Sequence, residues 1–73
     1  MPNLYNISAN DTIKVALKKG YFISRQKGSH IRMSHKEKDS ITIPNHKIIG
    51  RGLLKKILRD ANISVAELIK LIK

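Results

Sequence analysis

Residues 21–34 read YFISRQKGSHIRMS, and this stretch decides the fold of the 73-residue chain. The residues on either side of the Gly28-Ser29 pair have the two-residue period of short β-strands. Because glycine tolerates positive φ, Gly28 permits a tight turn between the two strands. The stretch therefore predicts a β-hairpin whose second strand begins at His30.

The alternation along the hairpin predicts which side chains face a core. It places Ile23 and Arg25 together on one face of the first strand. On the second strand it places Ile31 inward and leaves His30 and Arg32 on the opposite, polar face. His30 is thus expected on an open surface, next to cationic side chains.

The rest of the chain predicts a third strand and three helices. Residues 40–44 alternate and end at a proline, which cannot continue a strand ladder. An apolar period of three to four residues predicts helices over residues 13–19 and 53–61. A capping box at residues 64–67 predicts the start of a third helix. Asn10, Asp11 and Thr12 are the expected N-caps of the first helix, Gly20 ends it, and residues 1–10 are expected to form an irregular arm.

This order predicts a single α+β domain over residues 1–73. Three consecutive strands with short connections form an antiparallel meander, and helices should cover its apolar face to give a two-layer sandwich. The α-β-β-β-α core, with an additional short C-terminal helix, has the order of a double-stranded RNA-binding-like fold. The other face of the sheet should be basic and open.

Composition indicates the kind of partner. The chain carries 15 Lys and Arg against 5 Asp and Glu, a formal net charge of +10, which favours a polyanion. It has no cysteine, so disulfides and thiolate metal sites are excluded. No segment has the length and hydrophobicity to span a membrane and no signal pattern opens the chain, so we expect a cytoplasmic protein without a membrane partner.

Several short motifs follow one another in a distinctive order and spacing: Gly20-Tyr21, Arg25-Gln26-Lys27-Gly28-Ser29-His30, Ile43-Pro44, His46, Gly52-Leu53-Leu54 and Ile57-Leu58-Arg59-Asp60-Ala61. Together they resemble the HicA toxin family. The resemblance runs from about Ile13 to Leu68. It implies a small mRNA interferase with a double-stranded RNA-binding-like fold, which cleaves mRNA and is neutralised by a HicB-like antitoxin. We expect the free chain to be monomeric and to form a hetero-oligomer with that antitoxin.

The resemblance implies that His30 is the catalytic residue. Cleavage of RNA without a metal needs a general base and a general acid, a task suited to histidine. The residues predicted to contact RNA include Arg25, Lys27, Gly28, Ser29, Arg32 and His46. The others are Arg51, Lys55 and Arg59, which recur every four residues and form a basic stripe on a helix. The three histidines lack metal-ligand spacing, so neither a metal nor another cofactor is predicted. His35 is expected to be a solvated loop residue.

Two other functions remain open from the residues alone. The same fold could serve as a non-catalytic module that binds duplex RNA, although Lys55-Lys56 only partly matches the lysine cluster of such modules. The last two helices could bind DNA as a helix-turn-helix, but the final helix is apolar where a recognition helix is polar. Loss of RNA cleavage on substitution of His30 would distinguish a nuclease from the duplex-RNA-binding and DNA-binding alternatives.

Overall fold

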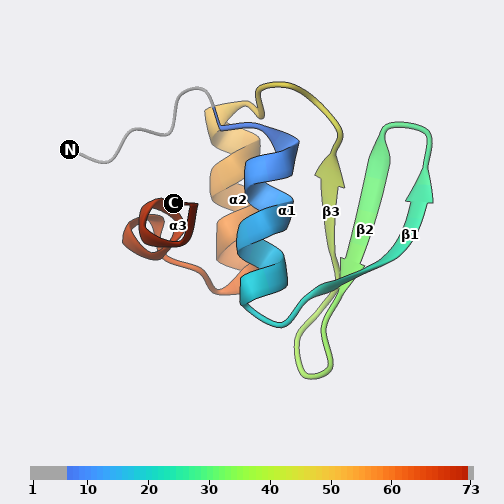
Figure 1. Ribbon diagram of the computed structural model, residues 1–73, viewed down its shortest axis with the longest axis horizontal. Helices are drawn as coiled ribbons and strands as arrows, with labels where there is room; N and C mark the ends of the chain where they lie inside the picture. Colours follow the sequence, from blue (N-terminus) through green and yellow to red (C-terminus); the bar gives the residue numbers. More distant parts are fainter. Residues whose placement is uncertain (1–6, 73) are drawn as a thin grey trace.

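The computed structural model describes residues 7–72 and has the predicted order of elements (Figure 1). The helices and strands are α1 (Ala9–Lys18), β1 (Phe22–Lys27), β2 (His30–Ser34), β3 (Ile41–Pro44), α2 (Arg51–Ala61) and α3 (Val65–Ile72). The α+β class with a three-stranded antiparallel sheet is therefore confirmed.

The first helix begins earlier than predicted. Ser8, not a residue of the 10–12 segment, is the N-cap: its Oγ accepts a hydrogen bond from the Asp11 amide at 3.0 Å, and the Asp11 carboxylate accepts one from the Ser8 amide at 3.2 Å. This reciprocal capping box satisfies two amide donors at the start of the helix. The prediction of an irregular arm is thus wrong for residues 9 and 10, and its residues 1–6 lie outside the described part of the chain.

The helices cover only part of the sheet. The strand order is β1-β2-β3, and both α1 and α2 pack on β3. Figure 1 shows β1 as the strand farthest from the helices, and all six of its residues are exposed. The expectation that helices cover one whole face of the sheet is wrong at β1, because the two helices are centred on β3.

A β-bulge in β1 corrects the predicted facing of its side chains. Ile23 pairs with Met33 and Arg25 with Arg32, so Ser24 is an extra residue between the two pairs. Directly paired residues of adjacent strands share a face of the sheet. Ile23 therefore shares the helix side with Met33, whereas Arg25 lies on the open side with Arg32. The prediction that Ile23 and Arg25 share one face is wrong, since simple alternation does not anticipate the bulge.

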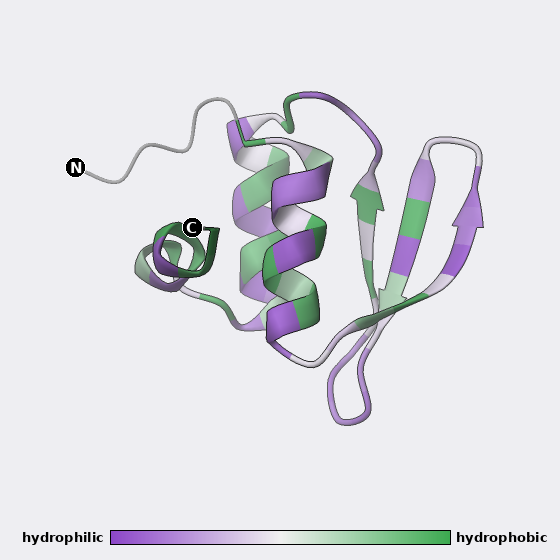
Figure 2. Ribbon diagram, viewed as in Figure 1, coloured by the Kyte–Doolittle hydropathy of each residue, from purple (hydrophilic) through white to green (hydrophobic). Residues whose placement is uncertain are grey.

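The core lies between β2, β3 and the helices. Its fully buried side chains include Met33, Ile43, Leu54 and Leu68, which come from four different elements. Along α1 and α2, Figure 2 shows hydrophobic and hydrophilic residues side by side, as expected for helices with one face in the core. Tyr21, just before β1, is also buried, and its hydroxyl has no hydrogen-bond partner among the described residues.

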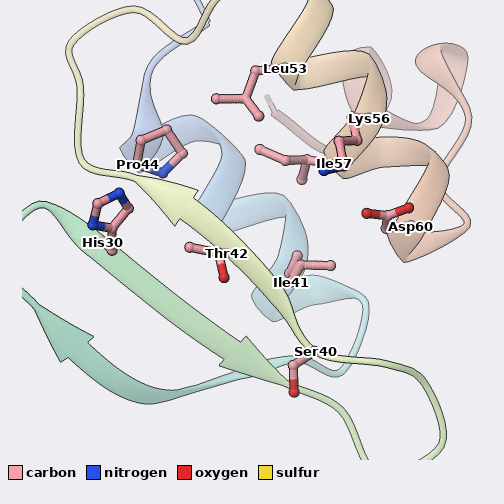
Figure 3. Close-up of a pocket in the computed structure, with 9 residues that line it drawn as sticks. All are labelled: His30, Ser40, Ile41, Thr42, Pro44, Leu53, Lys56, Ile57 and Asp60. Carbon is pink, nitrogen blue, oxygen red and sulfur yellow. The ribbon is translucent and has the colours of Figure 1, made fainter.

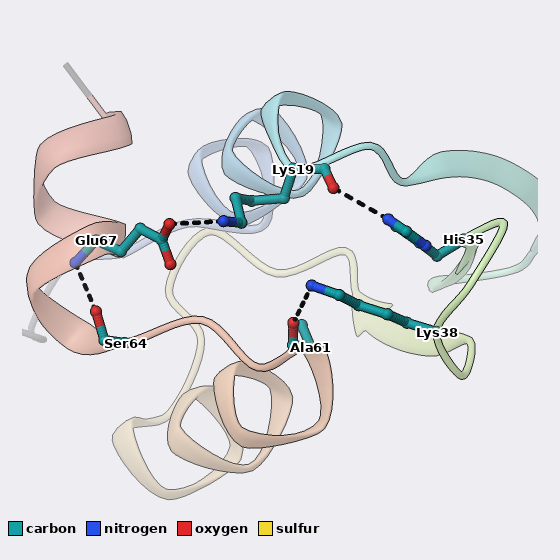
Figure 4. Close-up of polar contacts among 6 residues, drawn as sticks. All are labelled: Lys19, His35, Lys38, Ala61, Ser64 and Glu67. Carbon is teal, nitrogen blue, oxygen red and sulfur yellow. Dashed lines mark hydrogen bonds and ion pairs between the residues drawn. The ribbon is translucent and has the colours of Figure 1, made fainter.

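Helix α3 is attached to the end of α1 by lysine side chains, of which Figure 4 shows Lys19. The Lys19 ammonium lies 2.6 Å from the Glu67 carboxylate, and Lys18 donates to the carbonyl of Leu71 at 2.7 Å. Ser64 caps the Glu67 amide at 3.0 Å, as the sequence predicts. The Glu67 side chain makes its ion pair with Lys19, so α3 is held to α1 through charge as well as apolar packing.

His35 is a structural residue, not the solvated loop residue predicted. Its Nδ1 accepts a hydrogen bond from the Glu37 amide at 2.9 Å, which leaves Nε2 to donate to the Lys19 carbonyl at 3.2 Å (Figure 4). Its ring meets the Tyr21 ring edge-on, with centroids 4.8 Å apart. A Cβ at Gly20 would lie 3.0 Å from His35 Nε2, so the missing side chain makes this close approach possible. His35 thereby joins the end of β2 to the end of α1.

Candidate active site

The hairpin turn places His30 at the start of β2. Lys27 pairs with His30 across a two-residue loop, and Gly28 has a φ of +59° while Ser29 does not have positive φ. This is the φ pattern of a type II′ turn, which matches the twist of the two strands. The Asn45 amide donates to the Ser29 carbonyl at 2.6 Å and so fixes the turn to the segment after β3. His30 is thus held between Lys27 on one side and Pro44 on the other.

A basic cavity lies beside His30 on the open face of the sheet. Its volume is about 220 Å³, and it is lined by Arg25, Lys27, His30, Arg32 and Thr42. The bulge at Ser24 is what puts Arg25 and Lys27 on this face with Arg32 and His30. Three cations around one imidazole form a site suited to an anionic group such as a phosphate.

His30 also lines a second cavity, which we call the β3–α2 groove (Figure 3). The groove has a volume of about 340 Å³ and lies between β3 and α2. Its lining residues are His30, Ser40, Ile41, Thr42, Pro44, Leu53, Lys56, Ile57 and Asp60. His30 and Thr42 belong to both cavities, so the two meet at the edge of the sheet.

The other predicted RNA-contacting residues lie outside these two cavities. Gly28 and Ser29 form the turn, and the exposed side chains of Arg51, Lys55 and Arg59 line neither cavity. His46 lines a third cavity with Ser8 and Asn10 at the start of α1. The structure therefore brings Arg25, Lys27 and Arg32 to His30, but not His46 or the basic stripe.

Sequence reasoning missed the residues of α2 that line the groove. Leu53, Lys56, Ile57 and Asp60 follow the spacing i, i+3, i+4, i+7 and so share one helix face. From the sequence, the apolar residues Leu53 and Ile57 indicate only that this face packs in the core. The two polar members, at the same spacing, were the signal that this face also borders a solvent-accessible cavity.

Residues 7–72 lack the features of a metal site and of a membrane-spanning helix. They contain no group of three or more His, Cys, Asp or Glu side chains placed to hold a metal ion. None of the helices in this part of the chain is long and apolar enough to cross a membrane.

A protein-family model matches most of the chain. The family model described as the HicA toxin of bacterial toxin–antitoxin systems matches residues 9–63, which run from the first residue of α1 to just past α2 and include the whole sheet. No curated protein matches the chain. The matched region contains His30, both cavities that it lines and the basic stripe.

Proposed function

Since the chain belongs to the HicA toxin family and is the toxin of a bacterial toxin–antitoxin system, we propose that it is an mRNA-cleaving endoribonuclease with His30 as its catalytic residue. A HicB-like antitoxin would restrain it by covering the site. The substrate places the proposed activity in the cytoplasm, with the free toxin a monomer and the inhibited form a hetero-oligomer with the antitoxin.

The observation that carries the proposal is the position of His30 beside the basic cavity. The side chain is exposed, and Arg25, Lys27 and Arg32 line the same cavity. An RNA phosphate in this cavity would have its charge balanced by the three cations and would lie next to the imidazole. These are the parts that phosphodiester cleavage needs: a charge-stabilising pocket and a titratable group within reach.

The chemistry follows from these parts. The ribose 2′-oxygen attacks the adjacent phosphorus, and the bond from phosphorus to the 5′-oxygen breaks. His30 acts as the general base or acid, taking the 2′-hydroxyl proton or giving a proton to the departing 5′-oxygen. Arg25, Lys27 and Arg32 stabilise the extra negative charge on the pentavalent phosphorus. The products are a 2′,3′-cyclic phosphate and a 5′-hydroxyl.

We further propose that cleavage needs no metal ion. In this scheme the nucleophile belongs to the substrate itself, and its activation needs only proton transfer. The cations that stabilise the phosphate come from the chain. The spacing of the three histidines also does not match a metal site.

The test uses purified protein and single-stranded RNA in excess chelator. Wild type should cleave and leave a 2′,3′-cyclic phosphate, while a substrate with 2′-deoxyribose at the scissile position should resist. His30→Ala should lower the rate by about 10²–10⁴-fold, which is the contribution of a positioned acid or base. His30→Asn keeps a polar side chain without a titratable group and should be equally slow. Lys36→Ala, in the exposed loop after β2, is the control for truncation of a surface residue.

Three results would contradict the proposal. Full activity of His30→Asn would reduce His30 to a binding residue. Cleavage of the 2′-deoxy substrate, or a strict need for magnesium, would overturn the mechanism. Tight binding of duplex RNA with no cleavage by wild type would favour the non-catalytic module instead.

A further inference from the structure

The β3–α2 groove has two distinct ends (Figure 3). Pro44 and Leu53 lie near His30 at one end, while Ser40 and Asp60 lie at the other. Four residues of strand at about 3.3 Å each span about 13 Å, and seven residues of helix at 1.5 Å each span about 10 Å. The groove is therefore a channel that starts at the proposed catalytic residue and leads away from it.

The lining of the groove differs in kind from that of the basic cavity. Ile41, Pro44, Leu53 and Ile57 supply apolar walls, and the polar residues include one carboxylate, that of Asp60. The basic cavity has three cations and no acidic or aliphatic residue. A phosphate fits the basic cavity, whereas a flat, partly apolar group with polar edges fits the groove. The volume of about 340 Å³ lies within the range of small-ligand sites.

An RNA strand carries both kinds of group at a fixed separation. We propose that the groove binds the bases beside the scissile phosphate, and that Lys56 and Asp60 set the nucleotide preference. This inference rests on the proposed function, since it takes His30 as the point where the strand is cut. The base next to the scissile phosphate would lie between Pro44 and Leu53, and the following base would reach Lys56 and Asp60.

The chemistry of Lys56 and Asp60 predicts which bases are accepted. The Asp60 carboxylate accepts hydrogen bonds, and the Lys56 ammonium donates them. Adenine, cytosine and guanine each carry an exocyclic amino group close to an acceptor atom. Uracil has no exocyclic amino group, and its N3–H donor lies between two carbonyl oxygens that the Asp60 carboxylate would repel. We therefore expect selection against uracil at this position.

Both side chains are available for such contacts. Asp60 is exposed, and its ion pair within residues 7–72 is with Arg59, with 4.0 Å between Arg59 Nε and Asp60 Oδ1. Lys56 is exposed and forms no ion pair or hydrogen bond within residues 7–72. A base that bound here would therefore not have to break a strong contact inside the protein.

The first test is independent of cleavage. Cytidine 5′-monophosphate and ribose 5-phosphate are titrated into the wild-type protein, and methyl and amide NMR signals are followed. Both ligands should shift signals of the basic cavity, but only the nucleotide should shift the methyl signals of Leu53 and Ile57. Equal shifts at these methyls with both ligands, or none with either, would overturn the groove as a base site. The groove would also be ruled out as a base site if nucleotides do not shift these methyl signals and only an antitoxin protein does.

The second test maps cut sites in a random RNA pool. Lys56→Gln and Asp60→Asn should each change the preference at one position beside the cut by roughly tenfold, the usual scale of a lost base contact. Lys55→Gln is the matched control, because it removes the same charge from the neighbouring residue, which does not line the groove. Lys55→Gln should lower cleavage by the same factor at all cut sites and leave the nucleotide preference unchanged.

The outcomes separate this inference from the function on which it rests. If wild type cleaves RNA but Lys56→Gln and Asp60→Asn keep its preference, the groove inference fails and the nuclease stands. If wild type cleaves no RNA, the nuclease fails, and the nucleotide titration still decides whether the groove accepts a base. All three substituted residues are exposed, so loss of folding is not expected to obscure the result.

Discussion

At the scale of single residues, the two histidines at the ends of β2 have different tasks. His30 is exposed, its side chain forms no hydrogen bond within residues 7–72, and it lines both cavities. His35 is half-buried and joins two segments through both ring nitrogens. The hydrogen bond from the Glu37 amide fixes the tautomer of His35, since a backbone N–H can only donate.

This difference predicts opposite effects of two alanine substitutions. His35→Ala removes two hydrogen bonds and should cost about 1 kcal/mol or more, which lowers Tm by about 4–8 °C in a domain of this size. The proposed nuclease activity should remain at temperatures where the variant is folded. His30→Ala should change stability by under about 0.5 kcal/mol while cleavage is lost. Thermal unfolding and cleavage are measured on the same preparations, and an early-melting His30→Ala would make His30 a structural histidine.

At the scale of elements, α3 depends on a charged contact with α1. The Lys19 and Glu67 side chains are about 27% and 34% exposed, so water screens the pair only in part. The hydrogen bond from Lys19 is the main cause that holds the pKa of Glu67 below its ordinary value of 4.5, and the Lys19 charge adds to it. Because the folded-state pKa is lowered, this contribution to stability is present above about pH 4.5 and is lost as the pH falls through the folded-state pKa.

We therefore expect Glu67→Gln to lower Tm at neutral pH and to have little effect at pH 3. Wild type loses the contact on acidification, so the two proteins should converge there. Glu37→Gln, in the exposed loop after β2, removes the same charge without this ion pair and should follow wild type at both pH values. If Glu67→Gln lowered Tm by the same amount at pH 3 as at neutral pH, the glutamate would act through packing.

The elements were predictable from sequence where apolar period, caps and turns agree. The hairpin, β3 and the end of the first helix at Gly20 carry such signals, and the structure has left-handed backbone at Gly20. The bulge at Ser24 carries none, because serine has no special preference for it. The uncovered position of β1 depends on where the helices pack, which a local pattern does not determine.

The candidate site was predictable to a similar extent. His30 follows from the turn that places it and from the family resemblance, whereas Lys56 and Asp60 join it only through tertiary contact between α2 and β3. His35 was misjudged for the same reason, since its partner Lys19 is distant in sequence. Local patterns predict elements, and contacts between elements complete the site.

At the scale of the whole molecule, the charge of +10 produces a field that attracts any polyanion. The cavities beside His30 hold only some of these cations. Others lie on the exposed stripe of α2, among them Lys55 and Arg59. Affinity for RNA should therefore combine local contacts at the site with a general attraction that added salt weakens.

We expect RNA affinity to fall steeply with salt, by a slope of about 0.7 per neutralised phosphate for a single strand. Lys55→Gln with Arg59→Gln should reduce that slope if the stripe contacts phosphates. The matched double variant Lys36→Gln with Lys70→Gln removes two exposed cations elsewhere and should leave the slope near wild type. Equal slopes for the two double variants would show that the stripe is an ordinary solvated surface.

The exposed position of strand β1 has a consequence for local opening of the fold. Among the helices and strands of residues 7–72 it makes extensive contact with β2 alone, so it can open without disturbing the helices. Its backbone amides should exchange with deuterium well before those of β2 and β3, through local fluctuation and not global unfolding. Arg25 and Lys27 lie on this strand, so each such opening dismantles one wall of the basic cavity. A bound phosphate would oppose the opening, and slower exchange in β1 would then report occupancy of the site without any turnover.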